Sequence, residues 1–376
     1  MPYILLSSQP GILENFFSKI LNVIFDFIYN ITPVYSLGIT IILFTILIKV
    51  LLLPLALKQY TSTKKMKVIQ PKMKIIQDKY KNLKDQESQQ KMVAEMNALY
   101  AHHGTSPFGG CLPAIIQIPI IFALFNVLRE AYNYISKLSE IYNEIATKIM
   151  TLPNYNELFE PLLKTKNLLI KDIDSIDNLK TLTSSINNTE WATLLTKMPD
   201  SVASVLPSLI TTKNHIEGFF TINLTNVPNY TDISILIPVI TALTTYLSIK
   251  VTSASNKSDK DPKAAVDDTA SQIERSMATM IYFIPGLIFI TAFSFPSGLG
   301  IYWMLGNIFS IFQQLYFDKY VTVSTKNAIK TETREISDIA TRVTTKDAVK
   351  SDIPTRVTKK GGVKNEVHNK TRKKRK

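Results

Sequence analysis

The stretch LGITIILFTILIKVLLLPLAL, residues 37–57, decides the fold. It contains a single charged side chain, Lys49. At a rise of about 1.5 Å per residue, a helix of this length matches the roughly 30 Å hydrocarbon layer of a bilayer. The stretch therefore predicts a helix that crosses a membrane.

Further apolar stretches repeat this pattern along the chain. One runs from Cys111 to about Leu128, and its two prolines are tolerated in a bundle whose neighbouring helices satisfy the freed backbone groups. Another, residues 233–249, carries no charge. The 42 uncharged residues from 276 to 317 are too many for one span, and the turn FPSG at 295–298 divides them in two. The sequence thus predicts an all-α polytopic membrane protein with five transmembrane helices.

The composition agrees with this fold class. A formal net charge of +13 would also suit a nucleic-acid binder, but the apolar residues, 45% of the chain, are gathered into blocks long enough to cross hydrocarbon. Cys111 is the only cysteine, which excludes an intramolecular disulfide. The N-terminus shows no secretory signal pattern, so we expect export to use the spans themselves.

Basic residues are distributed unevenly among the loops, which predicts the orientation. Residues 57–104 carry ten lysines, whereas the longer segment 132–231 carries eight lysines against ten acidic residues. The segment after Phe317 carries seventeen basic residues against seven acidic ones. Loops rich in Lys and Arg stay in the cytoplasm. We therefore expect the N-terminus outside and the C-terminus inside, in a bacterial plasma membrane.

The predicted organisation follows the spans and loops in order. The segments are an external N-terminal part with an interfacial amphipathic helix (1–35), transmembrane helix 1 (36–57), a cytoplasmic helical hairpin (58–104), transmembrane helix 2 (111–131), an extracytoplasmic region (132–231), transmembrane helix 3 (232–250), a cytoplasmic loop (251–275), transmembrane helices 4 (276–296) and 5 (297–317), and a basic, disordered cytoplasmic tail (318–376).

The segments outside the spans carry weaker signals. Residues 11–31 have a helical period that places Phe16, Val23 and Phe27 on one side, which predicts an interfacial helix, with a short extra span as the alternative. The lysines of 58–104 suit a solvated face, and contact with anionic lipid or a ribosome is compatible with it. The tail contains two similar fourteen-residue segments, 337–350 and 351–364, with too few apolar residues for a core.

Lys49 requires an explanation, because a cation near the middle of a span costs at least a few kcal/mol. From Lys49 to the cytoplasmic end near Leu57 is about eight residues, or roughly 12 Å along the helix. A lysine side chain reaches about half that distance, so snorkelling alone falls short. We therefore predict a water-filled cavity, with Thr45, one turn earlier, extending its polar surface.

Other polar residues in the spans are further candidates. Gln117 either faces the same cavity or bonds to the backbone near Pro113, and the sequence leaves both interpretations open. In the fifth span an aromatic belt at the outer interface is the ordinary explanation for Tyr302 and Trp303. The candidate groove residues are Lys49, Thr45, Gln117 and Trp303.

Three stretches in this order resemble the YidC/Oxa/Alb insertase family: LIKVLLLPLALKQYTSTKKM at 47–66, SPFGGCLPAIIQIPIIFALF at 106–125 and FPSGLGIYWMLGNIFSIFQQ at 295–314. The resemblance covers roughly residues 15–320 without the external region. It implies five helices around a hydrophilic groove that is open to the cytoplasm and bilayer and closed outside. In the family a positive residue, usually arginine, occupies the groove at the position of Lys49. Lysine keeps the charge but lacks the planar fork that grips a carboxylate.

The resemblance also implies a function: an insertase and chaperone for nascent membrane proteins, acting alone or with the Sec translocon. The ribosome, contacted through the tail and hairpin, and anionic lipids are further expected partners. We expect no catalytic residue, cofactor or metal, since the sequence has no Walker motif and no HExxH motif. The alternative is a small-anion transporter or channel that uses Lys49, although no repeated pairs of broken helices indicate one.

Overall fold

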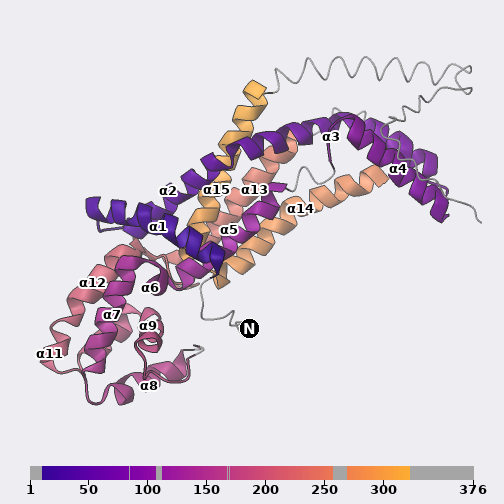
Figure 1. The fold of residues 1–376 in the computed structure, drawn as a ribbon. Helices are drawn as coiled ribbons and strands as arrows, with labels where there is room; N and C mark the ends of the chain where they lie inside the picture. The colour runs from indigo at the N-terminus through magenta and orange to yellow at the C-terminus, as the bar shows by residue number, and fades with distance from the viewer. Residues whose placement is uncertain are drawn as a thin grey trace, which may run out of the picture. The chain divides into compact units, whose positions relative to one another are not determined.

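Helices formed by the apolar stretches lie side by side in the middle of the structure (Figure 1). The computed structural model describes residues 11–83, 85–106, 112–166, 168, 170–256 and 269–321. The helices that form this bundle are α2 (Ser36–Leu51), α5 (Leu112–Arg129), α13 (Leu236–Asn256), α14 (Thr269–Thr291) and α15 (Ser297–Tyr316). Helix α15 packs against α2, α5 and α13, and is therefore the central element of the bundle.

The first apolar stretch differs from the predicted uninterrupted span 36–57. Helix α2 ends at Leu51, and α3 (Leu53–Tyr80) begins after Leu52 with a bend of 54°. Pro54 lies in the first turn of α3, where its missing N–H costs no hydrogen bond. The proline therefore explains why the chain can change direction here without breaking the helical path.

Length and hydropathy select fewer spans than the sequence predicts. In the described part of the chain, the segment Ile233–Ala254 alone is a single helix long and apolar enough to cross a membrane, and the bent pair α2–α3 qualifies as a second. The apolar parts of α5 and α14, Ile115–Arg129 and Ile281–Ser294, are shorter. Five spans thus remain a prediction.

Helix α1 (Ile12–Ile31) presents two apolar faces. Phe17, Leu21 and Phe25 are buried against the bundle, where α1 contacts α2 and α5. The face predicted from the sequence, which includes Val23 and Phe27, is exposed. One apolar face of α1 thus packs on the bundle while the other is exposed, and the interfacial location that the sequence predicts stays a prediction.

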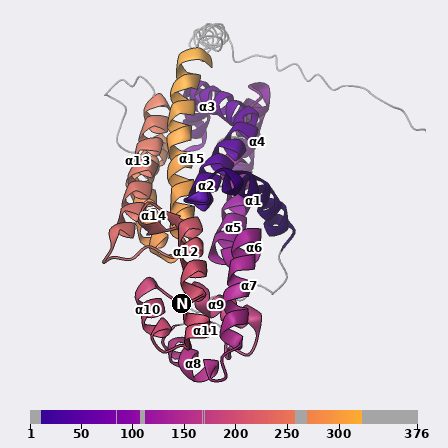
Figure 2. The same cartoon turned by 90° about the vertical axis from the view of Figure 1, so that its left-hand side faces the viewer.

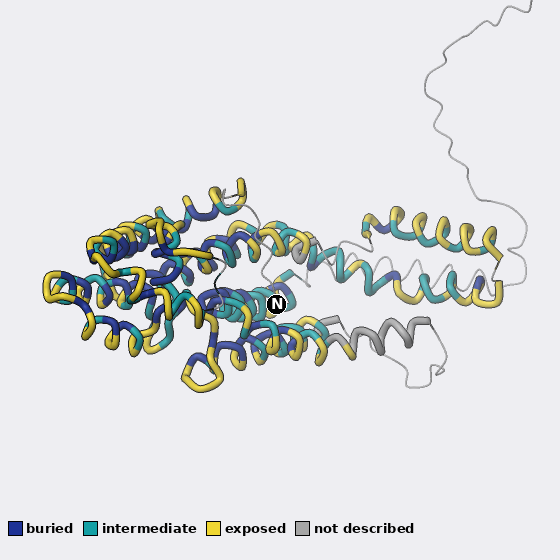
Figure 3. Tube along the Cα trace, turned by 90° about the horizontal axis from the view of Figure 1, so that it is seen from below, coloured by how far each residue is buried: buried dark blue, intermediate teal, exposed yellow. Residues whose placement is uncertain are grey.

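Helices α3 and α4 (Gln86–His102) form an antiparallel hairpin. The side chain of Asp85 caps α4 by accepting a hydrogen bond from the backbone of Ser88 at 2.8 Å. The hairpin buries few residues, and Figure 3 shows its tube mostly in the colours of intermediate and exposed positions. Packing between the two helices of the hairpin is therefore slight. At the base of the hairpin, Tyr60 and Lys64 contact Asp318.

Residues 131–223 form a separate layer beyond one end of the bundle (Figure 2). Trp191 and Tyr142 are buried in its core. A two-stranded antiparallel hairpin, which the sequence does not predict, joins it to the third apolar stretch. The elements of this layer are α6 (Ala131–Tyr134), α7 (Ser136–Met150), α8 (Tyr155–Thr165), α9 (Ile176–Ser184), α10 (Asn188–Leu195), α11 (Asp200–Ala203), α12 (Leu206–Glu217), β1 (Gly218–Phe219) and β2 (Ile222–Asn223).

Short turns complete the described chain. They are η1 (Ile233–Ile235) before α13, η2 (Ala292–Ser294) after α14 and a π-helical turn, η3 (Phe317–Val321), after α15. Residues 257–268 of the predicted cytoplasmic loop lie outside the described residues, as do Cys111 and the tail from 322, with its two similar segments.

Close packing of α13 on α15 depends on a glycine. Gly300 faces Ile237, and a Cβ added at Gly300 would overlap that side chain. The carbonyl of Gly300 also accepts a hydrogen bond from the hydroxyl of Thr241 at 3.2 Å. Small residues of this kind let the backbones of two helices approach closely.

We expect Gly300→Ala to lower the free energy of unfolding by about 1–3 kcal/mol, the usual cost of overpacking. Gly286→Ala in α14 is the matched control, since nothing lies within 4 Å of an added Cβ there. Alanine favours a helix over glycine by up to about 1 kcal/mol, so the control should be neutral or stabilising. Thermal unfolding in detergent, followed by tryptophan fluorescence, gives the unfolding midpoints of the two variants and the parent. Equal midpoints for the two variants would contradict the packing described.

Candidate functional site

A cavity of about 210 Å³ lies where α2, α5 and α15 meet. Such a volume holds several water molecules when its walls offer polar partners. The lining is mostly polar or aromatic, and consists of Lys49, Gln117, Ile121, Tyr302, Trp303, Gly306 and Asn307. The three helices thus form a partly open cavity in which Lys49, Gln117 and Asn307 meet two aromatic rings.

Lys49 enters this cavity from α2. Its ammonium nitrogen donates a hydrogen bond to the hydroxyl of Ser310 at 3.3 Å, and that hydroxyl donates to the carbonyl of Gly306 at 2.7 Å. No carboxylate among the described residues lies within 4.0 Å of the ammonium. The cation therefore faces the cavity with a neutral hydroxyl as its neighbour.

Gly306 makes room for this lysine. A Cβ at Gly306 would lie 3.2 Å from Cε and 3.5 Å from Nζ of Lys49. The contact with Cε is tight and the one with Nζ is ordinary, so a larger residue would require the end of the lysine side chain to shift by a few tenths of an ångström. The glycine therefore helps set where the positive charge lies.

Gln117 bonds across the cavity to α15. Its side-chain nitrogen donates to the hydroxyl of Tyr302, which is only 2% exposed. Of the two interpretations left open for Gln117, the structure favours the cavity. Tyr302 lies in the interior of the protein, and the aromatic-belt explanation does not hold for it.

Thr45 is the predicted site residue that the structure does not bring to the cavity. It is 1% exposed, and its hydroxyl donates to the carbonyl of Ile41 at 2.6 Å. A threonine in a helix can satisfy its hydroxyl on the preceding turn, so it needs no polar cavity. Trp303, by contrast, lines the cavity together with Lys49 and Gln117.

Several contributors are absent from the predicted set, among them Gly306 and Ser310. Their signal in the sequence is the spacing of Tyr302, Gly306 and Ser310, four residues apart, which places them on one helical face. Asn307, also part of the lining, donates to the hydroxyl of Thr245 at 2.8 Å and so ties α15 to α13. The polar residues of α15 thus serve both the cavity and the packing.

The chemistry available here is recognition of an anionic group. An ammonium and neutral donors can hold a carboxylate by charge-assisted hydrogen bonds, which are stronger than neutral ones. In the described ranges, no group of three or more His, Cys, Asp or Glu side chains gathers as metal ligands. The arrangement fits transient binding of an acidic segment.

Comparisons with known proteins find a matching family model and similar proteins. Residues 27–325 match the model of the family described as 60Kd inner membrane protein. The chain is 27% identical to a protein of Chloroherpeton thalassium named membrane protein insertase YidC, over 79% of this chain and 35% of that protein. A protein of the same name from Fusobacterium nucleatum is 44% identical over 28% of this chain and 49% of its own length. The chain thus spans about a third to a half of the length of these relatives.

A cysteine placed at the cavity should report its water. With Cys111 replaced by serine, we expect Lys49→Cys to react with a polar thiol reagent at least about tenfold faster than Val50→Cys, because only a thiolate in contact with water reacts. Val50 is 54% exposed on the outside of α2, where we expect lipid. The alkylation rates of the two variants in membrane vesicles make the comparison. Slow reaction at both positions would contradict a hydrated cavity.

Proposed function

We propose, because the chain belongs to the 60Kd inner membrane protein family, that it inserts nascent membrane proteins into the bilayer and helps them fold. The observation that carries the proposal is Lys49. Its cation faces a polar cavity formed by three helices of the bundle, without a carboxylate nearby among the described residues. A permanent salt bridge would occupy that charge, whereas here it can receive a carboxylate that arrives and leaves.

The proposed topology has five spans, with the N-terminus outside. Residues 132–231 then lie on the outer side, and the hairpin α3–α4 and the tail lie in the cytoplasm of a bacterium. The distribution of Lys and Arg supports this orientation, since residues 57–104 hold ten lysines. The separation of the layer α6–α12 from the hairpin α3–α4 by the bundle is consistent with it (Figures 1 and 2).

The proposed mechanism lowers the cost of moving a polar segment into hydrocarbon. Water in the cavity shortens the apolar barrier, and Lys49 supplies a counter-charge for an acidic residue of the client. The apolar part of the client then passes into lipid, where its transfer supplies the driving force. The membrane potential contributes about 2.3 kcal/mol per charge per 100 mV. No covalent bond is made or broken in these steps.

The proposed partners follow from the same arrangement. Nascent membrane proteins are the clients, received alone or together with the Sec translocon. Lysines on the surface of the hairpin, such as Lys79 and Lys91, can approach anionic lipid headgroups or ribosomal RNA. Each lies in a surface ion pair, and such pairs contribute little stability and open easily.

The test is insertion of a single-span client with an acidic outer segment into vesicles that contain the full chain. We expect Lys49→Ala to reduce insertion about tenfold, the loss expected from one hydrogen bond to a charged group. Lys49→Arg should retain activity because it keeps the charge. Lys164→Ala is the control, since this lysine forms a surface pair with Glu160 at 2.9 Å.

A second client, with its acidic residues replaced by amides, separates charge from hydration. Its insertion should depend much less on Lys49. Equal insertion of the acidic client by Lys49→Ala and the parent would show that the charge has no part in the mechanism. Failure of the parent itself would overturn the insertase proposal.

A further inference from the structure

Two aromatic residues with an unusual backbone conformation contact each other where the layer of residues 131–223 adjoins the bundle. Tyr35, just before α2, has a φ of 62°, and Phe220, in the turn between β1 and β2, has a φ of 53°. They are the two non-glycine residues with positive φ in the described part of the chain. Their ring centroids are 5.7 Å apart. A bulky residue rarely adopts this conformation, because its Cβ crowds the backbone.

Phe220 occupies a position where glycine is expected. Phe219 pairs with Ile222, so Phe220 and Thr221 form a two-residue loop. In loops of this length a residue with positive φ is usually glycine, asparagine or aspartate. Phe220 is also 74% exposed, so a large apolar ring stands in a strained position with most of its surface uncovered. Strain of this kind points to a role for the side chain outside the packing of the hairpin.

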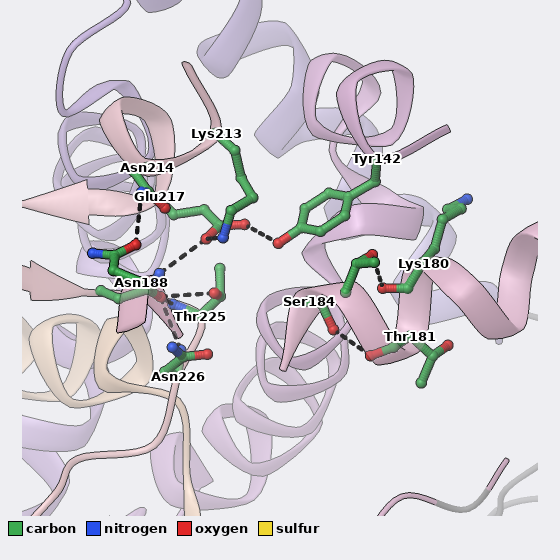
Figure 4. A network of polar contacts seen from close by, with 12 residues as sticks. Tyr142, Lys180, Thr181, Ser184, Asn188, Lys213, Asn214, Glu217, Thr225 and Asn226 are labelled. Carbon is green, nitrogen blue, oxygen red and sulfur yellow. Dashed lines mark hydrogen bonds and ion pairs between the residues drawn. The ribbon is translucent and has the colours of Figure 1, made fainter. Parts of the chain in front are cut away.

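A buried network at the base of the hairpin β1–β2 holds this turn in place. Glu217, the last residue of α12, is 1% exposed and accepts a hydrogen bond from the hydroxyl of Tyr142 at 2.7 Å (Figure 4). Its other carboxylate oxygen accepts from the side chain of Asn223, at the end of β2, at 2.9 Å. The backbone carbonyl of Glu217 accepts from the N–H of Leu224 at 2.9 Å. The turn that carries Phe220 therefore stands on a fixed support.

The exposed ring of Phe220 lies beside the start of α2. Tyr35, Phe219 and Phe220 form a first aromatic cluster, in which all three pairs of ring centroids are within 5.9 Å. Phe219 packs on Gly38 in the first turn of α2, where an added Cβ would overlap the ring. The N–H of Tyr35 donates to the carbonyl of His215 at 2.8 Å, which joins the start of α2 to α12. In a bilayer that surrounds the bundle, the end of a helix marks the boundary between hydrocarbon and headgroups.

A second aromatic cluster, formed by Tyr230, Phe289 and Phe293, lies at the same end of the bundle. Tyr230 is 69% exposed, and its ring stacks on that of Phe293 in η2 with centroids 4.2 Å apart. Phe293 contacts Phe289 of α14 edge to face at 5.5 Å. Gly298, in the first turn of α15, donates to the carbonyl of Leu224, just after β2, at 2.8 Å. Because η2 directly precedes α15, this bond places the cluster and the hairpin at one end of the bundle.

The side of α13 that follows Tyr230 is apolar and exposed. Its exposed apolar side chains recur at intervals of three or four residues, which places them on one face of the helix. They are Ile233, Leu236, Ile240, Leu243 and Leu247, all within the segment that is long and apolar enough to cross a membrane. Tyr230 comes three residues before the first of them and carries a hydroxyl on an aromatic ring. A polar tip on an apolar body suits the boundary where such a face ends.

We propose that the exposed rings of Phe220 and Tyr230 contact lipid and seat the layer of residues 131–223 on the membrane surface. Their partner is the boundary between headgroups and acyl chains, which in the proposed topology belongs to the outer leaflet. Lipid surrounds the bundle at this level, so it covers rings at two different helix ends at once. The inference goes beyond insertion itself and rests on the bundle crossing the bilayer.

This role accounts for the strain at Phe220. Glycine would relax the turn but would present nothing to the lipid, whereas an aromatic ring on a rigid hairpin reaches the boundary from a fixed direction. It also supplies the interfacial aromatic residues that the sequence placed at Tyr302, which is buried inside the protein. Two contacts, one beside α2 and one beside α13, then restrain the tilt of the layer relative to the membrane.

The experiment measures how close each ring lies to lipid. In the full chain with Cys111→Ser, Phe220→Cys and Tyr230→Cys are each labelled with a small fluorophore and reconstituted into vesicles of phosphatidylcholine and phosphatidylglycerol. Some of the lipids carry a nitroxide quencher, placed either near the headgroup or near the end of the acyl chain. Lys164→Cys is the control, because this side chain is 72% exposed and α8 lies at the end of the layer far from the bundle (Figure 2).

We expect the nitroxide near the headgroup to remove at least about half of the fluorescence of the Phe220→Cys and Tyr230→Cys probes, because interfacial groups enter the boundary by roughly 5–10 Å. The nitroxide near the chain end should quench these two probes less. Neither nitroxide should quench the Lys164→Cys probe. Melting curves check the fold of each variant.

A further pair of variants tests the ring itself. A probe at Thr221→Cys leaves Phe220 in place and reports from the same turn. Adding Phe220→Gly should at least about halve the quenching of this probe, since the apolar ring is what holds the turn at the boundary. This pair also decides the question if Phe220→Cys does not accumulate.

Three results would overturn the proposal. Quenching of the Phe220→Cys and Tyr230→Cys probes that is no greater than that of the control would leave the rings to a protein partner or a second copy of the chain. Quenching of only one of the two would refute the paired contact. Quenching at Thr221→Cys that Phe220→Gly does not change would show that the ring has no part in it. No client is present, so the outcome is independent of the insertion assay.

Discussion

The structure depends on the need to keep one cation, Lys49, inside an apolar bundle. An isolated charge in hydrocarbon is too costly, so polar residues must surround it or water must reach it. Three helices supply the surroundings, with Ser310 as a direct neighbour and Gly306 as the space beside it. The other polar contacts of α15, including that of Asn307 with Thr245, keep these walls together.

Much of the fold is readable from the sequence because apolar runs, charge distribution and turn residues act locally. The helices of the bundle, the hairpin α3–α4 and the helix α1 all follow from such patterns. The sequence does not show which face of α1 is buried, because both faces are apolar and only the neighbouring helices decide. The hairpin β1–β2 is also missed, since each strand has two residues and its turn places Phe220 at φ 53°, a conformation that favours glycine.

The site is predictable where a residue contradicts its surroundings. Lys49 and Gln117 are identified because each is polar within an apolar run. Thr45 does not line the cavity, since a hydroxyl can bond to its own helix and then needs no polar space. Gly306 and Ser310 are missed because small residues occur at helix contacts of every kind, so their role depends on the position of Lys49 in space.

The bend at Leu52 gives the hairpin a mechanical connection to the cavity. Helix α3 continues the helix that carries Lys49, and Asp318, just beyond α15, holds Tyr60 at 2.7 Å and Lys64 at 3.0 Å. The base of the hairpin is thus bonded to the end of α15, and the same helix α3 follows directly on α2, so both helices that flank Lys49 are connected to the hairpin at its base.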